Sequence, residues 1–284
     1  FIGNGAGLTN VPGFSPDSQE NLYAGSQAGD SSDADTCYNI GLGQNALELL
    51  NEGDSNIAIG CDAGRKVTSG ANNILIGENT GAYQLDTGSR NVLIGTAAGY
   101  CHDSGNCNVF IGSQAGKGHG TSGGTGGDNV IIGESAGCCL TSGSCNVFIG
   151  KVAGQNSTTN TSSVFIGCQA GQNIRADKNI AIGHNALATA TTGEHNTGVG
   201  DGVLANSSTS KNCAFGYHAL VNQTTGSYNN AFGHNCMDAT VTGPYNNAFG
   251  QNALGAITGG TKNGAFGQDC LANLTTGDYN TAFG

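Results

Sequence analysis

The sequence is poor in several residue types that ordinary globular proteins use freely. Its 284 residues include only 3 Pro, 1 Met and no Trp, and charged side chains make up 10% of the chain. It has no apolar run of the length that a membrane helix needs, so we expect no membrane span in this segment. The formal net charge of −11 argues against nucleic acid and anionic membrane surfaces as partners.

Glycine is abundant by contrast, with 50 residues. A collagen-like chain is excluded because these glycines do not recur every third residue. A simple disordered chain is excluded because Val, Ile, Leu, Phe and Ala occur steadily throughout the sequence. The composition therefore predicts a folded chain with a thin hydrophobic core.

An internal repeat runs from one end of the sequence to the other. Its unit reads Asn-x-(Ala/Leu/Phe/Ile)-(Ile/Phe)-Gly-x-x-Ala-(Gly/Leu), and most units are 17 residues apart. We number each unit from its central glycine as position 0. These glycines are Gly25, Gly43, Gly60, Gly77, Gly95, Gly112, Gly133, Gly150, Gly167, Gly183, Gly200, Gly216, Gly233, Gly250, Gly267 and Gly284.

The unit is too short for a helical hairpin and alternates as a β-strand does, for example over residues 108–112, Asn-Val-Phe-Ile-Gly. We therefore predict an all-β fold, a parallel β-solenoid of about sixteen coils with a 17-residue repeat. Each coil should contain a strand, a glycine bend, a short second strand and a polar turn. Residues 1–20 are interpreted as an entry or linker segment and residues 21–284 as the repeat domain, with a glycine-rich loop inserted at 117–128.

Side-chain volumes indicate which residues form the core. Where position −2 is large, position +4 is Gly, as in Phe148 with Gly154; where −2 is small, +4 is Leu or Met, as in Ala231 with Met237. A constant summed volume is expected if both side chains fill one cross-section of the same core. Ala58 with Gly64 breaks the rule.

If position −2 points inward, positions −3 and −1 point to the other face of the strand. Position −1 is nevertheless almost always Ile, Phe, Leu or Val, and a long apolar stripe is rarely left in water. We therefore expect this face to pack against copies of the chain. Position −4 is Asn in nearly every unit, with Ser163 as the exception, and is interpreted as a structural ladder bonded to the turns and to its own copies.

The units Asn179-Ile-Ala-Ile-Gly-His-Asn-Ala-Leu187 and Asn246-Asn-Ala-Phe-Gly-Gln-Asn-Ala-Leu254 resemble the head repeats of trimeric autotransporter adhesins. They are also similar to repeats in tail-fibre-like proteins of phages and large viruses. The resemblance covers nearly the whole chain and implies a left-handed parallel β-roll with three chains around an axis. We therefore expect self-association, as a homotrimer or as an end-to-end filament. It further implies adhesion or display at a cell-surface appendage or virion surface, with surface glycans or a cell-surface receptor as partners. The period here is longer than in the adhesin heads, and the cysteine content is unusual for either group.

Two functions other than that of a fibre are an acyltransferase and an ice-binding protein. Residues 111–116, Ile-Gly-Ser-Gln-Ala-Gly, match the hexapeptide of left-handed β-helix acyltransferases, but those enzymes use three hexads per coil and this chain has one. An ice-binding solenoid needs a flat threonine rank, whereas the threonines here form adjacent pairs at turns. His184 and His234 lie three coils apart, which is too far to share a metal. We therefore predict no enzyme and no catalytic, cofactor or metal residue.

Eleven cysteines favour an oxidising, extracellular compartment, and their odd number leaves at least one thiol outside any internal pairing. We predict disulfides between Cys101 and Cys107 and between Cys139 and Cys145, because each pair spans the same turn of its own coil. Each would add roughly 2 kcal/mol of stability. Two more, at position +3, are interpreted as buried thiols (Cys236 and Cys270), and four others have no assigned pairing (Cys37, Cys61, Cys138 and Cys168).

Asn-x-Ser/Thr triplets fall in the polar spacers between strands, where a glycan could be carried. The five candidate glycosylation sites are Asn156, Asn160, Asn206, Asn222 and Asn273.

Overall fold

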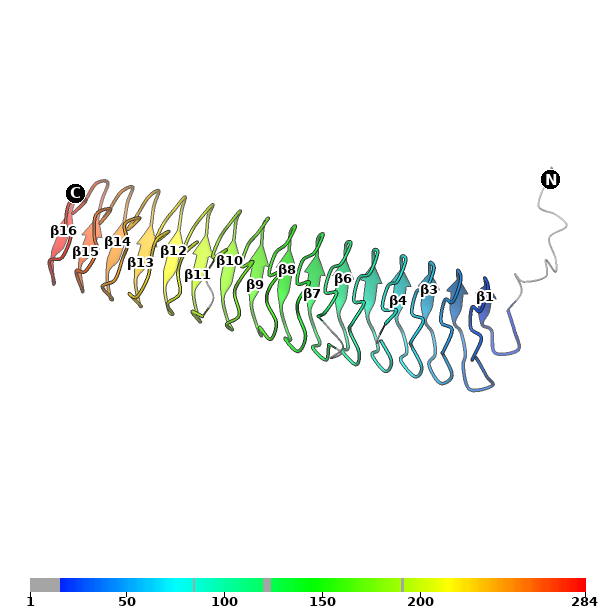
Figure 1. The fold of residues 1–284 in the computed structure, drawn as a ribbon. Helices are drawn as coiled ribbons and strands as arrows, with labels where there is room; N and C mark the ends of the chain where they lie inside the picture. Colours follow the sequence, from blue (N-terminus) through cyan, green and yellow to red (C-terminus); the bar gives the residue numbers. More distant parts are fainter. Residues whose placement is uncertain (1–15, 84, 120–123, 190–191) are drawn as a thin grey trace, which may run out of the picture. The chain divides into compact units, whose positions relative to one another are not determined.

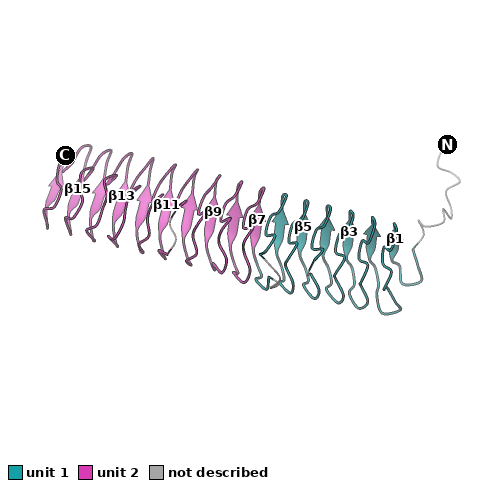
Figure 2. Ribbon diagram, in the orientation of Figure 1, with its two compact units in different colours: residues 1–128 teal, residues 129–284 magenta. Residues whose placement is uncertain are grey.

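A computed structural model of the chain describes residues 16–83, 85–119, 124–189 and 192–284. Most of the predicted entry segment, 1–20, lies outside these residues. The chain divides into two compact units, Phe1–Asp128 and Asn129–Gly284 (Figure 2). Each unit is a stack of coils with one three-residue strand per coil, as Figure 1 shows.

Unit 1 contains six strands in its described residues: β1 (Leu22–Ala24), β2 (Ile40–Leu42), β3 (Ile57–Ile59), β4 (Ile74–Ile76), β5 (Val92–Ile94) and β6 (Val109–Ile111). Unit 2 contains ten: β7 (Val130–Ile132), β8 (Val147–Ile149), β9 (Val164–Ile166), β10 (Ile180–Ile182), β11 (Thr197–Val199), β12 (Cys213–Phe215), β13 (Asn230–Phe232), β14 (Asn247–Phe249), β15 (Gly264–Phe266) and β16 (Thr281–Phe283). Within each unit every strand pairs in parallel with the next one along the chain. The predicted all-β parallel β-solenoid is confirmed.

The coil bends at its central glycine because only glycine fits there. The backbone of Gly150 has φ of 133°, and a Cβ added to it would lie 2.5 Å from the carbonyl oxygen of Gly167 in the next coil. Any other residue would therefore have to separate two coils that are held together by backbone hydrogen bonds.

The prediction of a second strand in each coil is wrong. Positions +2 and +4 both have left-handed backbone, as in Asn185 and Leu187 with φ of 55° and 50°, so the segment after the glycine is a turn. It still stacks on the next coil, because the Leu187 amide donates to the carbonyl oxygen of Val203 at 2.9 Å. Left-handed backbone costs a leucine about 1–2 kcal/mol, and complete burial of its side chain offsets this with about 2 kcal/mol.

The volume rule is confirmed by the packing of the core. Phe148 is fully buried, and a Cβ on Gly154 would lie 2.7 Å from its ring. The exception also has an explanation, since the space beside Gly64 is filled from neighbouring coils. A Cβ there would lie 2.5 Å from Leu75 and 3.0 Å from Leu47. Core volume is therefore conserved over adjacent coils as well as within one.

The asparagine ladder at position −4 is buried and bonded as predicted. The backbone amide of Asn56 donates to Asn39 Oδ1 at 2.8 Å, and its Nδ2 donates to the same oxygen at 3.1 Å and to the turn carbonyl of Gly70 at 2.9 Å. One side chain thus connects its own strand, the previous coil and the following turn. This arrangement satisfies polar backbone groups that the thin coil would otherwise bury without a partner.

At Ser163 the ladder lacks its asparagine, and a neighbour takes over part of its role. Asn160 occupies position −7, which is Gly in most coils, and its Nδ2 donates to the carbonyl oxygen of Ala176 at 2.8 Å. Ser163 Oγ accepts the Asn179 amide at 3.3 Å, a longer bond than the ladder makes elsewhere. Asn160 is therefore a buried structural residue.

Part of the predicted loop at 117–128 belongs to the coil stack. The Gly124 amide donates to the carbonyl oxygen of Cys101 at 2.8 Å, and the Asp103 amide donates to that of Gly124 at 2.8 Å. The inserted segment therefore rejoins unit 1 at Gly124, and residues 120–123 of the prediction lie outside the described residues.

Candidate functional site

The outer face of each unit consists of the side chains at positions −3 and −1 of its strands. The first strands of unit 2 present Val and Ile there, as in β8, and most of these side chains are half-buried by their neighbours. From β12 onward the −1 residues form a phenylalanine ladder, with ring centroids 4.8 Å apart between Phe232 and Phe249. Phe249 is 38% exposed, so the ladder covers ring faces and leaves ring edges in water. The predicted apolar stripe is present, and it is partly shielded by its own stacking.

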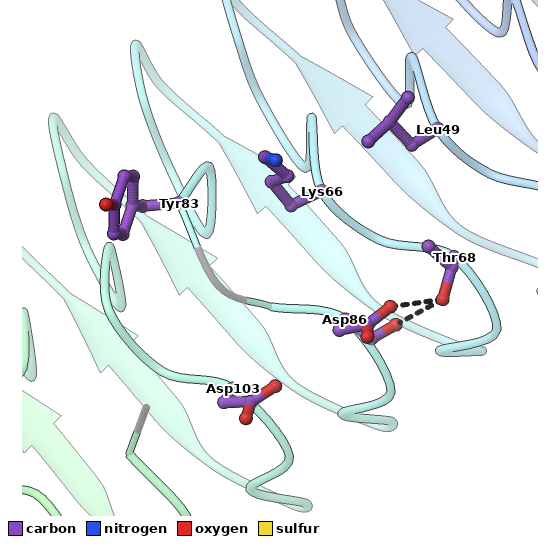
Figure 3. Close-up of a pocket in the computed structure, with 6 residues that line it drawn as sticks. All are labelled: Leu49, Lys66, Thr68, Tyr83, Asp86 and Asp103. Carbon is purple, nitrogen blue, oxygen red and sulfur yellow. Dashed lines mark hydrogen bonds between the residues drawn. The ribbon is translucent and has the colours of Figure 1, made fainter. Parts of the chain in front are cut away.

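A pocket of about 330 Å³ lies on the side of unit 1 (Figure 3). Six side chains line it, and we call it the tyrosine pocket: Leu49, Lys66, Thr68, Tyr83, Asp86 and Asp103. Figure 3 shows them in two rows that run across successive coils, with Leu49, Lys66 and Tyr83 in one and Thr68, Asp86 and Asp103 in the other. The pocket therefore combines apolar surface with donors and acceptors of hydrogen bonds.

Position +6 places the first row, because Leu49, Lys66 and Tyr83 each follow their central glycine by six residues. Tyr83 stacks on Tyr100, which stands at position +5 of the next coil, with ring centroids 5.4 Å apart and planes inclined by 16°. Tyr100 thus covers one face of the Tyr83 ring, and the pocket adjoins the side toward Lys66. In the second row, Thr68 Oγ1 donates to Asp86 Oδ1, which fixes the position of that carboxylate.

In unit 2 the same position, +6, is Asn in five of nine coils, and four of these asparagines bond to each other in two pairs. Asn156 Nδ2 donates to Asn173 Oδ1 at 2.7 Å, and Asn206 Nδ2 donates to Asn222 Oδ1 at 3.1 Å. Four of the five candidate glycosylation sites belong to this column: Asn156, Asn206, Asn222 and Asn273. Asn206 and Asn273 are exposed, whereas Asn156 and Asn222 are half-buried.

The fifth candidate, Asn160, is incompatible with a glycan in this fold. Its side chain is fully buried and its Nδ2 is bonded within the core, so that prediction is wrong for the folded chain. The reason is local, since Asn160 replaces the amide that Ser163 lacks.

The four cysteines predicted to form disulfides are thiols in the structure. Cys101 is buried while Cys107 is exposed, and Cys139 is half-buried while Cys145 is exposed. The two predicted bridges are therefore not formed, because the first cysteine of each pair packs against its coil and the second points into solvent.

Two other cysteines behave as predicted. Cys236 and Cys270 are buried thiols, and the Cys236 Sγ lies 3.3 Å from the carbonyl oxygen of Ala248. Burial raises the pKa of Cys236 to about 12, so this thiol stays protonated and is unreactive.

His102 is the only buried histidine among the described residues. It occupies position +7, a core position that is Leu140 in a unit 2 coil, and its ring packs edge-on against Phe110. Nε2 donates to the carbonyl oxygen of Gly126 at 2.9 Å, while Nδ1 finds no hydrogen-bond partner within the described part of the chain. Burial lowers the pKa of His102 to about 4, so the ring is neutral at pH 7.

No group of three His, Cys, Asp or Glu side chains suited to metal binding occurs in the described residues. The exposed His184 contacts Asp201 with 3.4 Å between Nδ1 and Oδ1, and both side chains lie on the surface. Within that same part of the chain, no helix has the length and apolar character that a membrane crossing requires.

Sequence reasoning missed both the tyrosine pocket and the burial of His102. An alignment of the coils would have indicated them, since Lys and Tyr at +6 and His at +7 depart from the residues found there in unit 2. The chain matches no protein-family model, and neither the curated proteins nor the solved structures contain a significant match to it.

Proposed function

We propose that this chain is a non-catalytic segment of a structural fibre, displayed outside the cell on a surface appendage or on a virion, where it serves adhesion or display. The observation that carries the proposal is the outer face, which repeats the same apolar position coil after coil in each unit. A repeated apolar row can be covered along its length by the same row of a second copy, because identical coils have identical spacing.

Side-by-side association, as in a homotrimer, follows from that argument, and joining of units end to end into a filament is the alternative form of assembly. The resemblance to adhesin head repeats supports three chains around an axis. The backbone ladder within each unit would supply stiffness, and the polar turns and lateral surfaces would supply attachment sites for glycans or a receptor.

The test is the mass and shape of the native protein. Analytical ultracentrifugation and electron microscopy should find elongated particles of several chains, and repeating both with reductant tests for disulfides between chains. A chain that stays monomeric over the accessible concentration range would overturn the proposal.

A matched pair of variants identifies the contact surface. Ile149→Lys together with Ile166→Lys places two charges on the outer face of unit 2 and should abolish association. Thr159→Lys places a charge on an exposed turn of the same unit and should leave the mass unchanged. Circular dichroism and urea denaturation of all variants confirm that the monomeric form is folded.

A further inference from the structure

The tyrosine pocket is built differently from the equivalent surface of unit 2. There, two pairs of asparagines at position +6 bond to one another, Asn156 with Asn173 and Asn206 with Asn222, so much of their hydrogen-bonding capacity is already used. In the pocket, an ammonium, two carboxylates and an aromatic ring border a common space together with Leu49. We infer that this pocket binds a neutral saccharide, with one sugar ring against Tyr83 and its hydroxyls bonded to Lys66, Asp86 and Asp103.

The composition of the pocket favours this ligand class over purely apolar compounds. A sugar ring has one face of C–H groups, which stacks on an aromatic ring, and a rim of hydroxyls that both donate and accept hydrogen bonds. Carboxylates accept from hydroxyls and an ammonium donates to them, and such charge-assisted bonds are the stronger ones. The volume of about 330 Å³ is at the lower end of the range for small-molecule sites, which suits one or two sugar rings.

Charge selects a neutral saccharide over an acidic one. Residues 1–128 carry 4 Lys and Arg against 13 Asp and Glu, a net charge of −9, whereas residues 129–284 carry 5 against 7, a net charge of −2. The two carboxylates in the pocket outnumber its single ammonium. A sialylated or sulfated glycan would therefore meet repulsion both in the pocket and from unit 1 around it.

This inference deepens the proposed adhesive role and rests on it for its biological setting, but its chemistry does not depend on self-association. A glycan array that carries neutral, amino and acidic oligosaccharides provides the first test. Binding of a neutral oligosaccharide is expected, and its affinity is then measured by isothermal titration calorimetry.

Two pocket variants and one control test whether the saccharide binds in the tyrosine pocket. Tyr83→Leu and Asp86→Asn should each weaken binding by about tenfold or more. Tyr245→Leu should have no effect, because Tyr245 is similarly exposed and stacks on Tyr228 in unit 2, but does not line the pocket. Urea denaturation confirms that each variant is folded.

The possible outcomes separate the two proposals. The absence of neutral saccharide binding, a preference for acidic glycans, or full affinity in Tyr83→Leu would overturn the saccharide site and leave the fibre intact. A monomeric chain that binds neutral saccharide through Tyr83 would keep the site and overturn the fibre.

Discussion

Unit 2 contains two kinds of coil that fill the same core in opposite ways. The coils of β7 to β9 carry a large residue at position −2 and Gly at +4, whereas the later coils carry a small residue at −2 and Leu or Met at +4. In both kinds the −2 side chain is fully buried. The solenoid thus conserves the side-chain volume in each core cross-section, and that volume can come either from the strand at position −2 or from the turn at position +4.

The outer face changes along with the core. In β8 and β9 it presents Val and Ile, and in β13 and β14 it presents Asn and Phe, with Asn230 Nδ2 donating to Asn247 Oδ1 at 2.7 Å. The aliphatic strands thus expose two apolar rows, and the later strands one aromatic row beside one polar row. Unit 2 therefore offers two different surfaces on one backbone geometry.

Among the predicted changes, exchange of the core residues between the two kinds of coil should change the free energy of unfolding the most. Phe148→Ala removes a buried ring that stacks on Phe165 at 4.7 Å, and should cost about 3–5 kcal/mol of unfolding free energy. The double variant Phe148→Ala with Gly154→Leu converts this coil to the later kind and should recover about half of that loss. Urea denaturation measures both.

The opposite exchange in a later coil serves as the matched control. Ala231→Phe alone overpacks the core and should destabilise it, while Ala231→Phe with Met237→Gly should be better tolerated than Ala231→Phe. If the effects of the paired changes simply add in both coils, the two positions do not share one space.

Buried His102 should give unit 1 a pH dependence that a leucine coil such as that of Leu140 lacks. Its pKa is about 4 in the folded chain and near 6.5 when unfolded, so above pH 6.5 the ring is neutral in both states. As the pH falls from about 6.5 to 4, only the unfolded chain gains the proton, and stability decreases by roughly 3 kcal/mol.

The variant His102→Leu isolates this contribution from the titration of the carboxylates. The stability of the natural chain relative to the variant should fall between pH 7 and pH 4.5 in urea denaturation. An identical pH dependence in the two proteins would contradict the burial of the His102 ring.

The compensation between Asn160 and Ser163 predicts a smaller, coupled effect. Asn160→Gly removes the bond to Ala176, and Ser163→Asn introduces an amide into space that Asn160 occupies, so each alone should destabilise the chain. Together they restore the Gly and Asn found in most coils and should be close to neutral, with a coupling energy of about 1 kcal/mol. A double-mutant cycle in urea measures it, and additive losses would contradict the compensation.

The five candidate glycosylation sites should differ in their glycan occupancy, and glycans at the exposed sites should change the free energy of unfolding little. After secretion from a eukaryotic cell, peptide mass spectrometry should find glycans at exposed Asn206 and Asn273 and none at Asn160. Occupancy at Asn156 and Asn222 should be lower, since these two side chains are half-buried whereas Asn206 and Asn273 are exposed. A fully occupied Asn160 would be incompatible with its place in the core.

The sequence by itself determined the features that every coil shares. The period, the parallel strands, the inward position −2 and the asparagine ladder recur so often that each coil confirms its neighbours, and volumes alone paired Phe148 with Gly154. The second strand was mispredicted because left-handed backbone at residues such as Leu187 leaves no mark in the hydrophobic pattern.

Only the tertiary structure decided the features that belong to a single coil. The separation of Cys101 from Cys107, the burial of Asn160 and the pocket beside Tyr83 each depend on which residues stand in the coils before and after. The physical reason is that a solenoid brings into contact residues about 17 positions apart. The repeat therefore predicts the contacts that all coils share. A candidate site such as the tyrosine pocket depends on residues that occur in only a few neighbouring coils.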